Sequence, residues 1–122
     1  MAVVTNPFTE EHNLLRESFS QFVDKEIRPN VEYWEKNKIC DREVFRKMGE
    51  QGFFGVSFPV AYGGSGMDMW SAVIIGEELS AAGIGGLSMS LYAHTYLPLP
   101  AINALGTEEQ KQKYLVPALK GE

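Results

Sequence analysis

A glycine-rich stretch, "FPVAYGGSGMD" at residues 58–68, is the first segment of this sequence whose composition suggests chemistry. Glycine backbones can cradle a phosphate, but a dinucleotide fingerprint needs G-x-G-x-x-G between a strand and a helix, and a P-loop needs a lysine. Here Gly63, Gly64 and Gly66 follow the pattern G-G-x-G, without that lysine and without an expected strand before them. Glycine also permits positive φ and close backbone approach. We therefore interpret the loop as a structural corner between two buried helices.

The histidine, cysteine and paired glutamate residues favour neither a metal site nor a catalytic site. Neither His12 nor His94 follows a glutamate at the Glu-x-x-His spacing of di-iron bundles. We interpret His12 as a capping or surface residue, and His94 as a satisfied core or interface residue rather than a base. Cys40, the only cysteine, lies at a predicted helix start, where a thiol pKa can fall, but no histidine is near it in sequence.

Two adjacent glutamates, Glu77 and Glu78, point about 100° apart on a helix, so they cannot act as a facing carboxylate pair. We therefore assign no catalytic residue, no cofactor-binding residue and no metal ligand to this chain.

A stripe of methionine, tyrosine and leucine is the feature most compatible with an apolar ligand. Its residues are Met89, Leu91, Tyr92, Ala93, Tyr96 and Leu97. Core packing alone would explain such a stripe. Small residues lie between the bulky ones, however, and leave room along one face, so the helix could line an apolar channel.

The elements that must position these residues are expected to be helices. Apolar residues recur at spacings of three and four, the pattern of a helix with a buried face. The predicted helices cover residues 9–27, 30–38, 41–52, 69–83, 83–106 and 107–121. The apolar segment 53–58 has no partner strand and is interpreted as buried coil. The sequence thus predicts one all-α, compact, bundle-like domain of about five or six helices.

Helix boundaries follow from residues that cap or interrupt the backbone hydrogen bonds. The predicted N-terminal caps are Thr9 or Asn6, then Asp41, Asp68, and Thr107 with Gln110 in a capping box. Pro29 should end or kink the first helix and Gly52 should end the third. Pro98 and Pro100 should weaken the largely buried helix 83–106, and Pro117 should break the last helix near its end.

Composition is that of an ordinary globular domain. The chain has 122 residues, 44% apolar and 22% charged, with a net charge of −5 that gives no reason to expect a nucleic-acid partner. No apolar run is long enough to span a membrane. The opening "MAVVTNPF" lacks the features of a secretory signal, and one cysteine excludes an internal disulfide. We expect a cytoplasmic protein, and we expect the ending "VPALKGE" to be a cut within a longer polypeptide.

Five segments, taken in order, resemble the amino-terminal helical domain of the acyl-CoA dehydrogenases. They are "FTEEHNLLRESFSQFVDKEIRP", "WEKN", "DREVFRKMGEQGFFGVSFPVAYGGSGMD", "GEELS" and "LGTEEQKQKYLVPALKGE". The resemblance covers nearly the whole chain, from Phe8 to Glu122. The segment "YAHTYL" is most similar to the long-chain and isovaleryl branches.

The resemblance implies that residues 1–122 are one domain of a longer flavoprotein that also has a middle β-domain and a carboxy-terminal helical domain. In this family a carboxy-terminal glutamate removes the α-proton of an acyl-CoA thioester, the β-hydride passes to FAD, and electron-transferring flavoprotein reoxidises the FAD. The missing domains hold most FAD contacts, so the isolated chain is expected to be inactive. The intact enzyme is expected to be a homo-tetramer, in the bacterial cytoplasm or, in a eukaryote, the mitochondrial matrix.

The resemblance also implies that the helix spanning residues 87–104 forms one wall of the acyl pocket. The implied acyl-chain contacts are Met89, Ser90, Ala93, Tyr96 and Leu97. Apolar faces that normally bury against the middle domain would be exposed in the isolated chain, which should therefore self-associate. Two other functions stay open: a free-standing helical domain that binds a partner protein, and a small ligand-carrying bundle.

Overall fold

Short polar side chains set where four of the helices begin. Four predicted caps are present, each with its side chain accepting a hydrogen bond from a backbone N–H of the first turn: Thr9, Asp41, Asp68 and Thr107. Each bond satisfies one of the unpaired donors of a helix N-terminus. Gln110 completes the predicted capping box at Thr107. Asn6, the alternative first cap, instead accepts a hydrogen bond from the backbone of Phe8.

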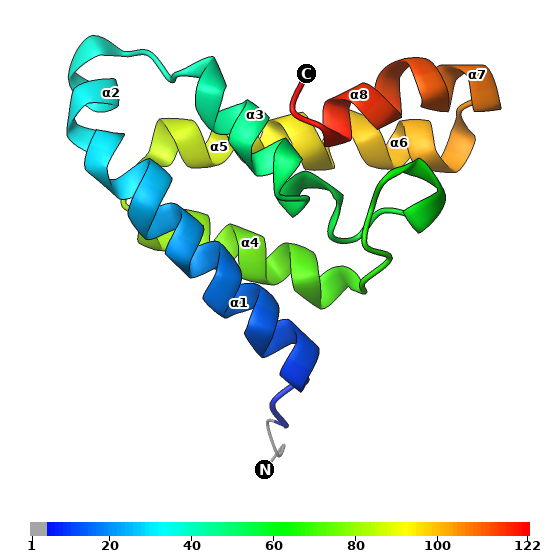
Figure 1. Cartoon of the computed structure of the whole chain (residues 1–122), viewed down its shortest axis with the longest axis horizontal. Helices are drawn as coiled ribbons and strands as arrows, with labels where there is room; N and C mark the ends of the chain where they lie inside the picture. The colour runs from blue at the N-terminus through cyan, green and yellow to red at the C-terminus, as the bar shows by residue number, and fades with distance from the viewer. Residues whose placement is uncertain (1–4) are drawn as a thin grey trace.

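The computed structural model describes residues 5–122, and within that range every regular element is a helix and no strand is present (Figure 1). The α-helices are α1 (Glu10–Phe22), α2 (Val31–Asn37), α3 (Arg42–Glu50), α4 (Met69–Ala81), α5 (Gly85–Tyr96), α6 (Pro98–Leu105), α7 (Glu108–Gln110) and α8 (Val116–Leu119). The predicted all-α fold is confirmed. The interpretation of "MAVVTNPF" rests in part on residues 1–4, which lie outside the described range.

A π-helical turn precedes a proline at two places in the chain. Val23–Ile27 leads into the 3₁₀ turn that contains Pro29, and Lys111–Leu115 leads into α8, which contains Pro117. Proline donates no backbone hydrogen bond and its ring clashes with the preceding turn, and the wider π turn relieves that crowding. The helix was predicted to end or kink near Arg28, and the regular structure does change there, from the π turn to the 3₁₀ turn Arg28–Asn30. The predicted break at Pro117 is wrong in position, because the irregularity lies before the proline and the helix continues to Leu119.

The predicted helix 83–106, and with it the pocket-wall helix 87–104, is two helices, which corrects the sequence interpretation. α5 ends at Tyr96 and α6 begins at Pro98, with Leu97 between them. Pro98 occupies the first helical position, where its missing N–H would be unpaired in any case and its fixed φ suits a helix start. The expectation that this segment is largely buried is also wrong for α5, whose only buried side chains are Leu87, Leu91 and Thr95.

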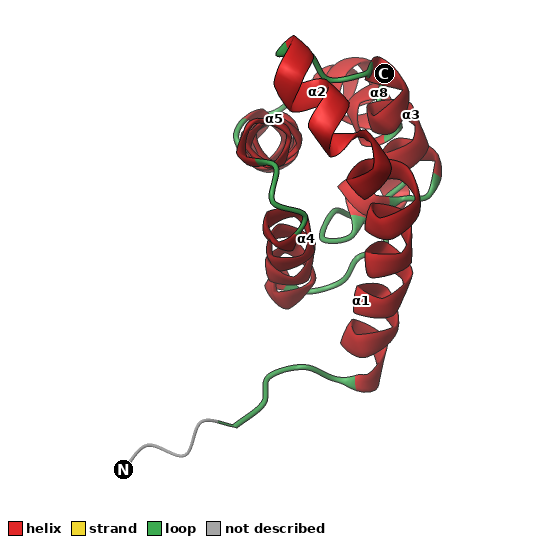
Figure 2. Ribbon diagram, turned by 90° about the vertical axis from the view of Figure 1, so that its left-hand side faces the viewer, coloured by secondary structure: helices red, strands yellow, loops and turns green. Residues whose placement is uncertain are grey.

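The helices form two layers around one apolar core. Figure 2 shows α4 and α5 nearly end-on along one side, with α1, α3 and α8 along the other. Between the layers lies an aromatic cluster in which the ring centroid of Phe53 is 4.7 Å from that of Phe19 and 5.3 Å from that of Phe22. Residues 53–58, predicted to be buried coil, form 3₁₀ and turn structure here. α5 lies on one edge of the core, and its outer face is open.

Candidate ligand-binding groove

The glycine-rich loop is a corner and not a phosphate cradle. Its backbone N–H groups donate within the loop and to the preceding turn: Gly64 to Pro59, Ser65 to Gly55, Gly66 to Phe58 and Met67 to Val56. A side chain at Gly64 would overlap the Phe58 carbonyl group, and Gly63 has φ +92°. Because these amides are already paired, they cannot bind an anion, and the structural interpretation of the loop is confirmed.

His12 joins the starts of two helices. Its Nδ1 accepts a hydrogen bond from the backbone N–H of Thr9 (3.0 Å), and its Nε2 lies 2.7 Å from Oδ1 of Asp68, the cap of α4. The Thr9 hydroxyl lies 3.1 Å from Nδ1, which gives a hydroxyl–imidazole–carboxylate line like that of a hydrolase. Here, however, the Nδ1 lone pair is occupied by an amide and the hydroxyl caps α1. The capping interpretation is confirmed, whereas the surface alternative is wrong, since His12 is 4% exposed.

The remaining titratable candidates are also held in structural contacts. His94 lies 2.9 Å through Nε2 from the carbonyl oxygen of Ala118, as expected of a satisfied residue. Cys40 precedes the helix cap instead of lying within the first turn, and burial, followed by the charge of Asp41, raises the pKa of its thiol. The predicted fall in that pKa is therefore wrong.

Arg16 binds both glutamates that the sequence analysis excluded as a facing pair. Its guanidinium nitrogens lie 2.6 Å from Glu77 and 2.8 Å from Glu78, and these hydrogen bonds raise the pKa of Arg16. One cation thus binds both carboxylates and ties α1 to α4, which is a structural role for the pair. Across residues 5–122 there is also no group of three or more potential metal ligands.

An apolar groove of about 570 Å³ between α4 and α5 is a candidate site for an apolar ligand. Figures 1 and 2 show the two helices side by side, and the chain reverses direction between them. The groove is lined by Val73, Gly76, Leu79, Ser80, Gly83, Ile84, Gly85, Ser88, Met89 and Tyr92. Three glycines and two serines keep its walls low, while Met89 is 68% exposed at its rim. Such a surface can hold an extended apolar chain.

The five predicted acyl-chain contacts are not all brought together at this groove. Met89 lines it, whereas Ser90 faces a second pocket and donates a hydrogen bond to the carbonyl of Gly86 (2.9 Å). Ala93, Tyr96 and Leu97 line neither space, although Leu97 is 73% exposed. The wall contributed by α4 was missed, because nothing in the sequence signals which turns of two separate helices will face one another.

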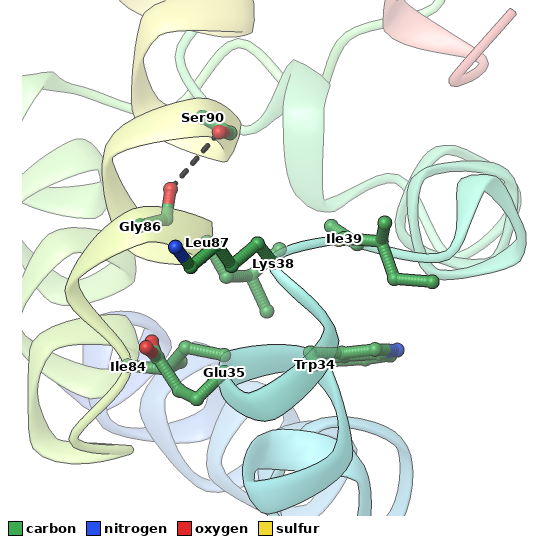
Figure 3. Close-up of a pocket in the computed structure, with 9 residues that line it drawn as sticks. Trp34, Glu35, Lys38, Ile39, Ile84, Gly86, Leu87 and Ser90 are labelled. Carbon is green, nitrogen blue, oxygen red and sulfur yellow. Dashed lines mark hydrogen bonds between the residues drawn. The ribbon is translucent and has the colours of Figure 1, made fainter.

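The second pocket, of about 300 Å³, lies between α2 and the first turn of α5 (Figure 3). Glu35 of α2 and Lys38, directly after that helix, extend towards α5 in this view, while Ile84 and Leu87 supply an apolar floor. The pocket carries one carboxylate and one ammonium, so it suits a long apolar chain less well than the groove between α4 and α5.

Tyr96 lies beside the groove with its ring centroid 4.5 Å from that of Tyr92. Burial raises the pKa of Tyr96 to about 12. Its hydroxyl has no hydrogen-bond partner among the described residues. The Ser57 hydroxyl is near enough to oppose this pKa shift, but it lies outside hydrogen-bonding geometry, so burial is the stronger influence.

Comparison with known proteins identifies a family for this fold. Residues 9–122 match the family model described as "Acyl-CoA dehydrogenase, N-terminal domain". The 3-(aryl)acrylate reductase of Clostridium sporogenes is 40% identical over 116 residues, which cover 94% of this chain and 30% of that protein. The short-chain specific acyl-CoA dehydrogenase of Clostridium acetobutylicum is 42% identical over 114 residues, covering 93% and 30%. The expected long-chain and isovaleryl types are also among the relatives, at 36% identity in Sus scrofa and 32% in Pongo abelii.

Solved structures share the same helical arrangement. An acyl-CoA dehydrogenase from Geobacillus kaustophilus superposes with a TM-score of 0.89 at 36% identity, covering 97% of this chain and 30% of that one. An acyl-CoA dehydrogenase from Bacillus anthracis, complexed with FAD, gives 0.83 at 33% identity, covering 94% and 20%. A structure described as the electron-transferring flavoprotein of Acidaminococcus fermentans gives 0.88 at 40% identity, covering 97% and 31%.

The chain spans about 30% of the length of the first relatives that it matches. No helix within residues 5–122 is both long and apolar enough to cross a membrane.

Proposed function

The chain belongs to the acyl-CoA dehydrogenase family, as its amino-terminal domain, and from this premise we propose that it acts within a longer FAD-dependent enzyme that oxidises acyl-CoA thioesters between Cα and Cβ. The family match and the similarity to an acyl-CoA dehydrogenase with FAD support this proposal. In it, residues 1–122 are one domain, and a middle β-domain and a carboxy-terminal helical domain complete the enzyme. This chain would supply one wall of the acyl pocket.

The observation that carries the pocket proposal is the apolar groove between α4 and α5. Its lining is almost free of charge, and its open side leaves Met89 exposed, so a second surface must cover it before water is excluded. On α5, Met89, Ala93 and Tyr96 follow one another at spacings of four and three, which puts them along one side of the helix, and Leu97 comes directly after its end. We propose that these residues, with Ser90, contact the acyl chain once the other domains are in place.

FAD would accept the hydride when bound. The glycine loop, the best candidate for its phosphates, has its amides paired within the fold. We propose that FAD is held mainly by the other domains, which would also supply the base that removes the α-proton. The contribution of this chain is to bind the apolar tail and to exclude water from it, which strengthens polar interactions at the reacting carbons.

Partners and location follow from the same family assignment. We propose an acyl-CoA as substrate and an electron-transferring flavoprotein as the acceptor of its electrons. We further propose that the intact enzyme is a homo-tetramer in the bacterial cytoplasm or, in a eukaryote, in the mitochondrial matrix. Similarity to bacterial and mitochondrial proteins is compatible with either compartment.

Expression of the uninterrupted reading frame tests this function. The intact protein should purify yellow with a flavin absorbance spectrum, and that absorbance should bleach when an acyl-CoA of preferred length is added without an electron acceptor. The 122-residue chain should be colourless and inactive under the same conditions.

A yellow, active 122-residue chain would contradict the proposal that the other domains hold FAD and supply the base. A stop codon directly after Glu122, together with a tightly bound protein partner, would favour the alternative of a free-standing interaction domain. The large exposed apolar side chains, such as Leu105 at 87% exposure, are the observation in favour of that alternative.

A further inference from the structure

The pocket between α2 and the first turn of α5 differs in character from the apolar groove. Its volume is about 300 Å³ (Figure 3). Pockets that hold small molecules span roughly 300–1,000 Å³, so this pocket lies at the lower limit of that range. It is too small for a CoA thioester or a flavin, and its size suits a compact metabolite.

Two opposite charges line this pocket on the side of α2. In Figure 3 the carboxylate of Glu35 and the ammonium of Lys38 both point towards α5. Neither group takes part in an ion pair within residues 5–122, whereas ion pairs do join other charged residues of the domain, such as Lys47 and Glu26. The pocket therefore offers a ligand one hydrogen-bond acceptor and one donor of opposite charge.

Buried apolar side chains form the floor of the pocket. Trp34 belongs to α2, Ile84 directly precedes α5, and Leu87 lies in the first turn of α5. All three belong to the core, so their positions are fixed by packing. A ligand that lays an apolar group on this floor removes apolar surface from water, which favours binding.

The backbone of Lys38 is also unusual. Its φ is +53°, in the left-handed region that favours glycine. Lys38 ends α2, and every other residue with positive φ between residues 5 and 122 is a glycine. Glycine at this position would relieve the backbone, but it would also take the ammonium out of the pocket. A side chain that is kept at a strained backbone position is a reason to look for a function of that side chain.

We infer that this pocket binds a small α-amino acid with an apolar side chain. Lys38 binds its carboxylate, Glu35 binds its ammonium, and the apolar floor holds its side chain. A ligand with only a carboxylate would leave Glu35 without a partner and close to a like charge, and a ligand with only an amine would do the same to Lys38. A zwitterion is therefore complementary to the pocket. This inference goes beyond the proposed function and does not depend on it.

Equilibrium dialysis of the intact protein against labelled L-methionine tests this inference. L-methionine carries both charges and a flexible apolar side chain, and a ligand of its size should bind with a Kd of roughly 0.1–1 mM. Three control ligands each lack one of these groups: glycine, the analogue of methionine without its amino group, and the analogue without its carboxyl group. Each should bind about three- to tenfold more weakly than L-methionine.

Variants separate binding from any structural role of the two charged residues. Lys38→Gly relieves the backbone and removes the ammonium, so the free energy of unfolding should be unchanged or higher while the Kd rises about three- to tenfold. A lysine with only a structural role would leave the Kd unchanged. Glu35→Gln should raise the Kd by a similar factor. Lys36→Met removes the same charge from α2 at a position that lines neither pocket, and it should leave the Kd unchanged.

Absence of saturable L-methionine binding up to about 10 mM overturns this inference. Binding that persists unchanged in both Lys38→Gly and Glu35→Gln also overturns it, because the ligand would then lie elsewhere. Tighter binding of either analogue with a single charge does the same, since the pocket would then select an acid or an amine. Dialysis requires no turnover, so the result is independent of whether the intact protein oxidises an acyl-CoA.

Discussion

Tyr96 carries the only buried side-chain polar atom among residues 5–122 that lacks a hydrogen-bond partner. Burying a hydroxyl without a partner costs stability, whereas removing such a group is close to neutral or stabilising. The same burial raises the pKa of Tyr96 to about 12, above the value of about 10 expected for an unfolded tyrosine. The contribution of the neutral phenol to the free energy of unfolding is therefore complete below pH 10 and is lost as the pH rises from about 10 towards 12.

Tyr96→Phe should consequently be at least as stable as the wild-type chain at neutral pH, and more stable above pH 10. Thermal denaturation at a series of pH values measures this, with Tyr33→Phe, at an exposed tyrosine, as the control that should follow the wild type. A loss of more than about 1 kcal/mol at neutral pH would mean that the hydroxyl makes a stabilising hydrogen bond after all.

Single residues were predictable where their role is local in sequence. Asp41 and Asp68 were identified as caps because the pattern that reveals a cap spans only a few positions. The contact between His12 and Asp68 joins residues 56 positions apart, and no spacing rule signals such a pair. For the same reason Met89 was found from its own helix, whereas its neighbour across the groove, Gly76, was not.

At the scale of whole elements, two glycines allow α3 to pack closely against the end of α8. A side chain on Gly49 of α3 would overlap the carbonyl group of Lys120. Reciprocally, Gly121 has φ +79°, and a side chain there would overlap the carbonyl of Phe45 in α3. Backbone thus packs directly on backbone, and neither helix can rotate without separating from the other.

Gly49→Ala should therefore destabilise the chain by about 1–3 kcal/mol, the usual cost of inserting atoms into a packed contact. Urea denaturation measures the difference in the free energy of unfolding. Gly86→Ala is the matched control: nothing lies within 4 Å of its added Cβ in α5, so it should be neutral or stabilising by up to about 1 kcal/mol. Equal effects of the two substitutions would show that helix propensity, and not the contact with α8, governs position 49.

Helix existence was predictable from periodicity, but helix continuity was not. The apolar pattern of residues 83–106 runs on through Leu97, because a side chain can remain in register while the backbone hydrogen bonds are interrupted. A proline inside a long helix and a proline that starts a new helix differ only in the backbone angles of the preceding residue. The π turns before Pro29 and Pro117 were missed for a similar reason, since they leave no mark in the apolar spacing.

Large apolar side chains remain exposed across the whole molecule, among them Val60, Met69, Met89, Leu97 and Leu105. Exposed patches of this kind mark surfaces that another part of a protein normally covers, and they favour association when left open. The isolated 122-residue chain should therefore self-associate as its concentration rises.

Sedimentation or light scattering over a range of concentrations measures this association. Leu105→Glu should weaken it by placing a charge on the most exposed leucine, whereas Gln21→Glu, the same charge change on the outer face of α1, should not. A clean monomer at high concentration would contradict the prediction.

α5 attaches to the domain by a narrow seam, Leu87, Leu91 and Thr95, spaced four residues apart. The positions that border the groove are interleaved with this seam but are not part of it. Substitutions at the groove positions can therefore accumulate during evolution without disturbing the three residues that hold α5 to the domain. The fold and the ligand specificity therefore depend on different faces of the same twelve-residue helix.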